Sequence, residues 1–194
     1  MPDAMKRRFF DLSIDVYVPG RWYFKTPTHL EGQPLDNPWE FTRGTPIPSP
    51  GLLRIPLSRP GKPLDFTSAG VGVTPVLSTR AAEVFRTLAP NDVQLFPVQV
   101  EGQVEPYFLL VAARTVRCVD EAASEEFKLW TPEDGQPEKV GGYKYVAGLR
   151  IDKTKVADER VFRPWGLRSA LIVDGDLKDA LEQTGIVGGQ FVEV

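Results

Sequence analysis

Proline is unevenly distributed along this chain, and its distribution limits what the first part of the chain can form. Eleven of the eighteen prolines lie between Pro19 and Pro75. Proline has a fixed φ and no N–H for a sheet ladder, so it occurs in turns, at strand ends and on edge strands. We therefore expect residues 1–75 to form a proline-rich lobe of loops and short strands. Residues 76–194 are expected to form a second, more regular α+β domain.

A pattern that occurs twice is the second constraint. Residues 76–98, VLSTRAAEVFRTLAPNDVQLFPV, align without gaps with residues 172–194, IVDGDLKDALEQTGIVGGQFVEV, at an offset of 96 residues. Equivalent positions are Ser78 and Asp174 (both helix-capping types), Ala81, Val84 and Phe85 with Leu177, Ala180 and Leu181, and Leu95 and Phe96 with Phe191 and Val192. The pattern predicts a repeated strand–helix–strand unit rather than a single active site. The helices should start near Thr79 and Gly175, and Gly185 suits the C-terminal cap of the second helix.

The remaining segments favour strands joined by turns. Residues 9–18 alternate between apolar and polar types, which predicts a strand that ends at Pro19-Gly20. DVQLFPVQV and VEPYFLLVAARTVRCV flank Glu101-Gly102-Gln103 and predict a hairpin, whose long apolar second strand should lie centrally in its sheet. Residues 120–128, DEAASEEFK, favour a short acidic helix. The predicted fold is α+β, with a mixed, largely antiparallel sheet and a few short helices.

The composition argues against several classes of protein. A formal net charge of −3 and a pI of about 5.3 do not suit binding to nucleic acid through bulk charge. The apolar runs are too short to span a membrane, and a single cysteine excludes an internal disulfide. We expect a cytoplasmic protein with no nucleic-acid or membrane partner, and the sequence leaves its oligomeric state open.

The sequence offers little for catalysis. One histidine and one cysteine cannot supply a zinc site of the usual composition, and no phosphate-binding or dinucleotide-binding glycine motif occurs. His29 lies in a loop with no recognisable nucleophile nearby, and Cys118 ends an apolar run in which a thiol is expected to be buried. We therefore expect no catalytic residues, no metal site and no cofactor. A small hydrolase or transferase that uses His29 or a pair of carboxylates is the alternative.

A concentration of negative charge is the clearest candidate for a binding site. Residues 120–138 contain seven carboxylates and one lysine, a formal charge of −6. Such a surface is either a solvated face or a contact for a basic partner, whose approach it would accelerate. The predicted contact residues are Asp120, Glu121, Glu125, Glu126, Trp130, Glu133, Asp134 and Glu138. The second candidate surface is the proline-rich segment 26–50, which carries His29, Trp39 and Phe41.

Several segments, taken in order, resemble a known family. They are GTPIP…GLLRIPLSRPGKPLDF, PVLSTRAAEVF, VRCVDEAAS, GLRIDKTKVADERVFRP and ALIVDGDLKDALEQTGIVGGQFVEV. Together they resemble the immunity protein family numbered eleven of bacterial polymorphic-toxin systems, formerly a domain of unknown function. The resemblance runs from about Phe41 to the C-terminus, with a weaker trace in RWYF, and the end of the chain is its most specific part.

This resemblance implies a cytoplasmic antidote that binds and neutralises a cognate secreted toxin, commonly a nuclease, delivered by sister cells in kin discrimination. It implies no enzymatic activity and no cofactor. It assigns no binding residues, because the shared pattern is structural and the acidic segment matches the family only at its start, CVD. A structural or regulatory interaction module without a toxin partner is a further alternative.

Overall fold

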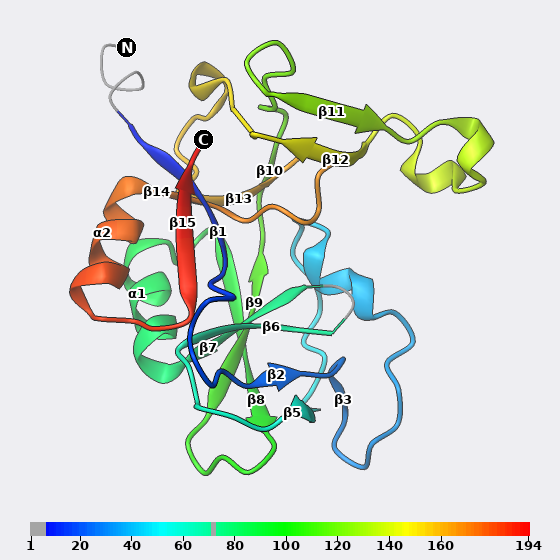
Figure 1. Ribbon diagram of the computed structural model, residues 1–194. Helices are drawn as coiled ribbons and strands as arrows, with labels where there is room; N and C mark the ends of the chain where they lie inside the picture. Colours follow the sequence, from blue (N-terminus) through cyan, green and yellow to red (C-terminus); the bar gives the residue numbers. More distant parts are fainter. Residues whose placement is uncertain (1–6, 71–72) are drawn as a thin grey trace.

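The computed structural model describes residues 7–70 and 73–194, so residues 1–6 and 71–72 of the predicted N-terminal lobe lie outside it. These described residues form an α+β fold in which two α-helices accompany mixed, largely antiparallel sheets (Figure 1). The described residues contain three parallel strand pairs, β10–β13, β2–β6 and β4–β8, and the other pairs are antiparallel. The predicted fold class is therefore confirmed.

The elements form two larger sheets and one hairpin. The five-stranded sheet has the order β10 (Thr115–Val116), β13 (Val161–Pro164), β14 (Ile172–Asp174), β1 (Phe9–Ile14) and β15 (Gly189–Glu193). The eight-stranded sheet has the order β3 (Thr28–His29), β4 (Leu53–Ile55), β8 (Val93–Val100), β9 (Tyr107–Ala112), β7 (Thr74–Ser78), β6 (Phe66–Ala69), β2 (Tyr23–Phe24) and β5 (Leu57–Arg59). The hairpin pairs β11 (Glu126–Leu129) with β12 (Tyr143–Ala147). The helices are α1 (Thr79–Leu88) and α2 (Gly175–Gln183), with short 3-10 turns at Pro38–Thr42 (η2), Pro132–Asp134 (η3), Pro137–Lys139 (η4) and Lys153–Lys155 (η5).

The predicted repeat is confirmed, and its two copies share the same strand register. The first unit is β7–α1–β8 with β9 between its strands, and the second is β14–α2–β15 with β1 between its strands. Leu109 of β9 pairs with Val76 and Phe96. Asp11 of β1 pairs with Ile172 and Val192, which lie 96 residues after Val76 and Phe96 respectively. Both helices begin where expected, capped by the side chains of Ser78 and Asp174.

Each unit also contains a preceding strand that the sequence alignment did not reveal. β6 pairs with β7, and β13 pairs with β14 in the equivalent register. The residue before each of these strands, Asp65 or Arg160, uses its carbonyl to accept the N–H of the helix-capping residue, at 2.9 Å in both units. Asp65 and Arg160 carry opposite charges, so no similarity of residue type marked them as equivalent.

These two residues fasten the units to each other. In the first unit Asp65 accepts hydrogen bonds from Arg80 and Ser78, at 2.6–2.7 Å, and Arg80 also donates to the carbonyls of Thr184 and Gly185 at the end of α2. In the second unit Arg160 pairs with Asp174 and Asp176 and donates to the Leu88 carbonyl at the end of α1. Each unit thus satisfies carbonyls at the C-terminus of the other unit's helix, which otherwise lack partners.

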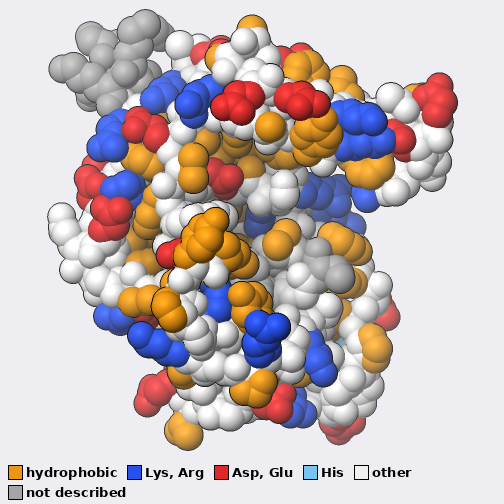
Figure 2. Space-filling view, in the orientation of Figure 1, with side chains coloured by type: hydrophobic (Ala, Val, Ile, Leu, Met, Phe, Trp, Pro, Cys, Tyr) orange, Lys and Arg blue, Asp and Glu red, His pale blue; other side chains and the backbone are white. Residues whose placement is uncertain are grey.

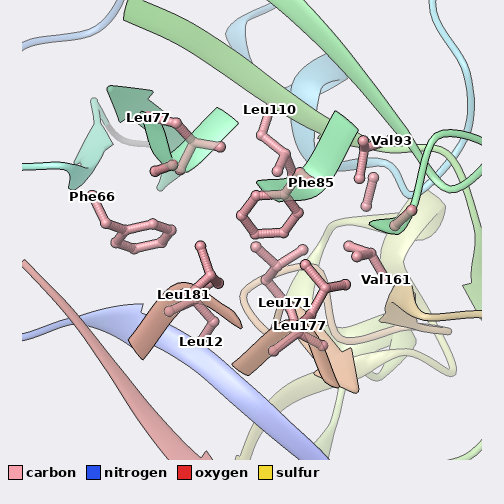
Figure 3. Packing of buried hydrophobic residues seen from close by; sticks show 14 of the residues in the cluster. Leu12, Phe66, Leu77, Phe85, Val93, Leu110, Val161, Leu171, Leu177 and Leu181 are labelled. Carbon is pink, nitrogen blue, oxygen red and sulfur yellow. The ribbon is translucent and has the colours of Figure 1, made fainter. Parts of the chain in front are cut away.

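Both helices and both larger sheets contribute to one apolar core (Figure 3). Phe85 of α1 and Leu177 and Leu181 of α2 are buried there against Leu110 of β9 and Leu12 of β1. Two further clusters lie elsewhere in the two larger sheets. One contains Trp22, Phe41 and Leu53, and the other contains Phe9, Cys118 and Phe162.

Other predicted elements divide into correct and incorrect ones. The hairpin around Glu101-Gly102-Gln103 is present, and β9 is central in the eight-stranded sheet as expected. The predicted acidic helix over residues 120–128 is wrong, because Glu126–Leu129 form strand β11. The Asp120 carboxylate accepts the N–H groups of Ala122 and Ala123, which closes a single turn. So short a segment gains more from pairing with β12 than from an isolated helix.

Ten of the eleven prolines between Pro19 and Pro75 lie outside the strands, as expected, whereas Pro75 lies within β7, an interior strand. Pro56 separates β4 from β5, which lies at an edge of the eight-stranded sheet. Strands β2–β6 of this region join the same sheet as β7, β8 and β9. The division into lobes at residue 75 stays a prediction. Expression of residues 76–194 alone tests whether this part folds without the first 75 residues.

Asp11 replaces an apolar residue at the centre of the second unit. The equivalent position in the first unit is Leu109, which is fully buried. Burial raises the pKa of Asp11 to about 6, although the Leu171 N–H and the charge of Arg163 act in the opposite direction. Arg163 is itself buried, which lowers the pKa of its guanidinium to about 10, so both groups are charged at pH 7.

We expect that the Asp65–Ser78–Arg80 arrangement of the first unit can replace its equivalent in the second unit. Arg160→Asp should cost about 3–5 kcal/mol in urea unfolding, because it leaves the buried Asp174 beside another carboxylate. The triple variant Arg160→Asp/Asp174→Ser/Asp176→Arg reproduces the arrangement of Asp65, Ser78 and Arg80 and should recover most of that loss. Arg54→Asp is the control, since Arg54 lies 4.0 Å from exposed Glu101 and should change stability by under about 1 kcal/mol. A triple variant as unstable as Arg160→Asp would contradict the equivalence.

We expect Asp11 to make stability depend on pH. Its pKa is higher in the folded chain than its ordinary value of 3.8, so folding favours the protonated acid. The contribution of Asp11 to the free energy of unfolding is therefore largest at low pH. It should fall by up to about 3 kcal/mol between pH 4 and pH 6 and stay constant at higher pH. The measurement is the difference in unfolding free energy between the wild type and Asp11→Asn across this range. A difference that does not change with pH would refute the assignment.

Candidate functional site

The acidic residues singled out in the sequence lie on a part of the chain that projects from the two larger sheets. We call residues 120–147 the acidic arm: the turn after Asp120, the β11–β12 hairpin and its tip, residues 130–142. In the described part of the chain β11 and β12 pair only with each other. The hairpin stands out at the upper right of Figures 1 and 2. A two-stranded hairpin is marginally stable alone, so its extension into solvent has to be supported by local contacts.

The arm concentrates negative charge relative to the rest of the molecule. The predicted contact residues Glu121, Glu125, Glu126, Glu133 and Glu138 are exposed, and Asp120, Trp130 and Asp134 are half-buried. Strand β12 and the tip add Lys139 and Lys144, which reduces the charge from the −6 of residues 120–138 to −4 over the whole arm. The rest of the chain has nineteen carboxylates and twenty lysines and arginines, a formal charge of +1. The net negative charge of the protein therefore comes from the arm.

Several of these carboxylates also hold the arm together. Tyr143 donates its hydroxyl to Glu121 at 2.8 Å, and Tyr145 donates to Glu126 at 2.5 Å. Burial, and then the bond to Glu121, raise the pKa of Tyr143 to about 12, and the bond to Glu126 raises the pKa of Tyr145. These two carboxylates thus have a structural role within the arm.

Asp134 organises the tip. Its carboxylate pairs with Lys144 and accepts the backbone N–H of Thr131 at 2.8 Å. The hydrogen bond from Lys144, followed by that from Thr131, lowers the pKa of Asp134 to about 2. Trp130 lies against two cations of the same region, with the Lys139 and Lys144 ammonium groups 4.8 Å and 5.0 Å from the centre of a Trp130 ring. The role of Trp130 as an anchor for a partner stays a prediction, and its ring already has contacts within the arm.

The second candidate surface, residues 26–50, is attached to the rest of the fold by packing and by hydrogen bonds. Phe41 is fully buried in the cluster around Trp22 and Leu53, so its proposed place on this surface is wrong. The side chain of Gln94 exchanges two hydrogen bonds with the backbone of Ile47, which fixes the end of the segment. Trp39, 49% exposed, and His29, also exposed, remain available for contacts.

The groups considered for chemistry are not gathered into one site. Cys118 is buried as expected, and burial raises the pKa of its thiol to about 12, which suppresses the nucleophilic thiolate. His29 lies at the far edge of the eight-stranded sheet, on β3. Within residues 7–70 and 73–194 no three histidine, cysteine or carboxylate side chains are grouped as metal ligands. No helix among these residues is both long and apolar enough to cross a membrane.

Two residues that the sequence analysis did not single out also lie beside the acidic arm. Arg117 follows β10 and Trp165 follows β13, and these two strands run parallel, with Val116 opposite Pro164. Trp165 donates its backbone N–H to the Val116 carbonyl at 2.8 Å. The Arg117 guanidinium consequently stacks on the Trp165 indole, 3.5 Å from a ring centre. The two residues are far apart in the sequence, so no local pattern could have predicted their contact.

Comparison with known proteins places the chain in a family. A family model described as the immunity protein family Imm11 matches residues 19–194, nearly the whole chain. The match includes the acidic arm, both strand–helix–strand units and most of the proline-rich region. No curated protein matches the chain.

We expect the tip of the acidic arm to be dispensable for folding. Its ion pair and cation–π contacts lie within the arm, and at its base Trp130 donates its backbone N–H to the Gly142 carbonyl. Replacing residues 131–141 by Asn-Gly should close the hairpin with a two-residue turn. The melting temperature should change by less than about 4 °C, corresponding to under about 1 kcal/mol. Loss of cooperative unfolding would show instead that the tip supports the core.

Proposed function

The chain belongs to the Imm11 immunity protein family, and we propose that it binds and neutralises a cognate bacterial toxin without making or breaking a covalent bond. The single observation that carries this proposal is the family match, because it extends over residues 19–194 and not over one motif. An immunity protein of this kind acts in the cytoplasm, where the toxin would otherwise reach its target.

The charge distribution supports a toxin with a basic face. The arm carries −4 while the rest of the chain carries +1, so a basic partner is attracted to one end of the molecule. Nucleases bind phosphates and therefore present basic clefts, which makes a nuclease the toxin class that we propose. Occupation of such a cleft by the arm would exclude the nucleic-acid substrate by volume and by charge. This mode of inhibition needs no catalytic group.

The proposed contact surface is the acidic arm, with Asp120, Glu121, Glu125, Glu126, Trp130, Glu133, Asp134 and Glu138 as its residues. Glu125, Glu133 and Glu138 form the part most suited to a partner, because they are exposed and make no ion pair within the described residues. Glu121, Glu126 and Asp134 are tied to residues of the arm. They would contribute to the potential of the surface more than to direct contacts.

The test is protection of cells from the toxin encoded beside this gene. Co-expression of the wild-type chain should restore growth, and the purified proteins should form a complex. Glu125→Lys/Glu133→Lys/Glu138→Lys should lower the association rate constant about tenfold or more at low salt, since long-range attraction is reversed, and should weaken the dependence of that rate on salt. Surface plasmon resonance at several salt concentrations measures both effects.

A matched variant controls for the change in net charge. Glu31, Asp36 and Glu105 are exposed carboxylates outside the acidic arm, the first two on the second candidate surface, and reversing all three to lysine changes the net charge by the same amount. This control should associate at nearly the wild-type rate. If both triple variants slow association equally, the arm is not the contact surface. If the wild-type chain neither protects cells nor binds the toxin, the proposed function is wrong.

A further inference from the structure

The base of the acidic arm contains a compact group of two exposed aromatic residues, a half-buried tyrosine and an exposed arginine. We call Arg117, Phe127, Tyr143 and Trp165 the root patch. Arg117 stacks on Trp165, and the Phe127 and Tyr143 rings meet edge to face with their centres 6.1 Å apart. Tyr143 donates its backbone N–H to the Gly166 carbonyl at 2.9 Å, which joins the two pairs into one surface.

Two rings of the root patch are partly exposed, whereas the phenylalanines of the neighbouring core cluster are buried. Trp165 is 37% and Phe127 is 36% exposed, whereas Phe9 and Phe162 in the neighbouring core cluster are completely buried. Burial of these two large rings would stabilise the fold more than their partial exposure beside an arginine does. Folding stability therefore does not explain why they are exposed. Tryptophan, tyrosine and arginine are also the residue types that dominate the energetic centres of protein interfaces.

The patch is held rigid before any partner arrives. Gly166, at φ +78°, and Gly142 approach so closely that a Cβ on Gly166 would lie 3.0 Å from the Gly142 Cα. The Tyr143 hydroxyl is fixed by Glu121, and the Trp165 backbone is fixed by Val116. A surface that is already ordered loses little conformational entropy on binding, so its contacts translate more directly into affinity.

Arg117 has binding capacity that the described residues do not use. Within residues 7–70 and 73–194 its guanidinium makes no ion pair and no hydrogen bond, although it is exposed and fixed by stacking. A stacked guanidinium keeps the N–H groups at its edge free, in a geometry that matches a carboxylate. Arg117 therefore suits an acidic side chain presented by a partner.

The surrounding charges identify the kind of partner. Glu121 is bonded to Tyr143 and borders the patch, and the carboxylates of the adjoining acidic arm give the arm a formal charge of −4. These carboxylates repel the phosphates of nucleic acids and of anionic membranes. They also repel a second copy of this chain, which carries the same residues. An apolar centre with an acidic border is complementary to a protein face that has an apolar recess within a basic rim.

We propose that the root patch is the anchor of the toxin complex: Trp165 and Phe127 fill an apolar recess in the basic face of the toxin, and Arg117 pairs with a toxin carboxylate at its border. This inference rests on the proposed function and specifies which residues hold the complex together after the acidic arm has attracted the toxin. The arm's free carboxylates then control association, and the root patch controls dissociation.

The experiment measures dissociation of the purified full-length chain from the toxin encoded beside its gene. Trp165→Ala should raise the dissociation rate constant at least tenfold, with the association rate constant changed by less than about threefold. Arg117→Ala should raise it by a similar factor. Arg117→Lys, which keeps the charge but loses the planar fork and most of the stacking, should restore only part of the wild-type lifetime. Because Arg117 is exposed, its variants should fold even if Trp165→Ala does not.

Trp39→Ala is the matched control, since Trp39 is the exposed tryptophan of the second candidate surface. It should leave dissociation unchanged. If Trp165→Ala and both Arg117 variants, folded by circular dichroism, dissociate at the wild-type rate while the wild-type chain binds the toxin, the root patch is not the anchor and the proposed function stands. A larger effect of Trp39→Ala would place the anchor on residues 26–50. Absence of binding by the wild-type chain would overturn the proposed function and this inference together.

Discussion

The reciprocal clamp between the two strand–helix–strand units is the interaction on which the rest of the fold depends. Arg80, held by Asp65, reaches the C-terminal carbonyls of α2, and Arg160, held by Asp174 and Asp176, reaches a C-terminal carbonyl of α1. Because each arginine neutralises carboxylates of its own unit and satisfies carbonyls of the other, neither helix end is complete without its partner unit. The shared core of α1 and α2 then joins both larger sheets into one body.

Two regions lie outside this repeated scaffold. One is the proline-rich region with β2–β5 and η2, and the other is the segment from Arg117 to Glu159 with the acidic arm. The first extends the eight-stranded sheet and buries Phe41, so much of it contributes to the core. The arm instead projects from the scaffold, carries the net negative charge and adjoins the exposed root patch. A rigid scaffold with one charged projection suits a protein that acts by occupying another protein's surface.

Patterns within one segment of the sequence were sufficient for α1, α2 and the β8–β9 hairpin. Ser78 and Asp174 marked the helix starts because capping is a local effect, and the equal spacing of apolar residues revealed the repeat. Features that depend on distant contacts were missed. Asp65 and Arg160 are equivalent but opposite in charge, and Arg117 meets Trp165 only because β10 and β13 run parallel. The segment 120–128 looked helical, but pairing with β12 decided its conformation. Exposed Trp165 could have been suspected from its position between a strand-ending proline and a glycine.

The central claim is that the toxin is held by the acidic arm and by the patch at its base. Hydrogen–deuterium exchange of the chain, alone and with its toxin, tests this claim most directly because it reports every segment in one measurement. We expect slower exchange over residues 120–147 and around Trp165, with α1 and α2 unchanged. Protection confined to residues 26–50, or none at all in a mixture that inhibits the toxin, would contradict it.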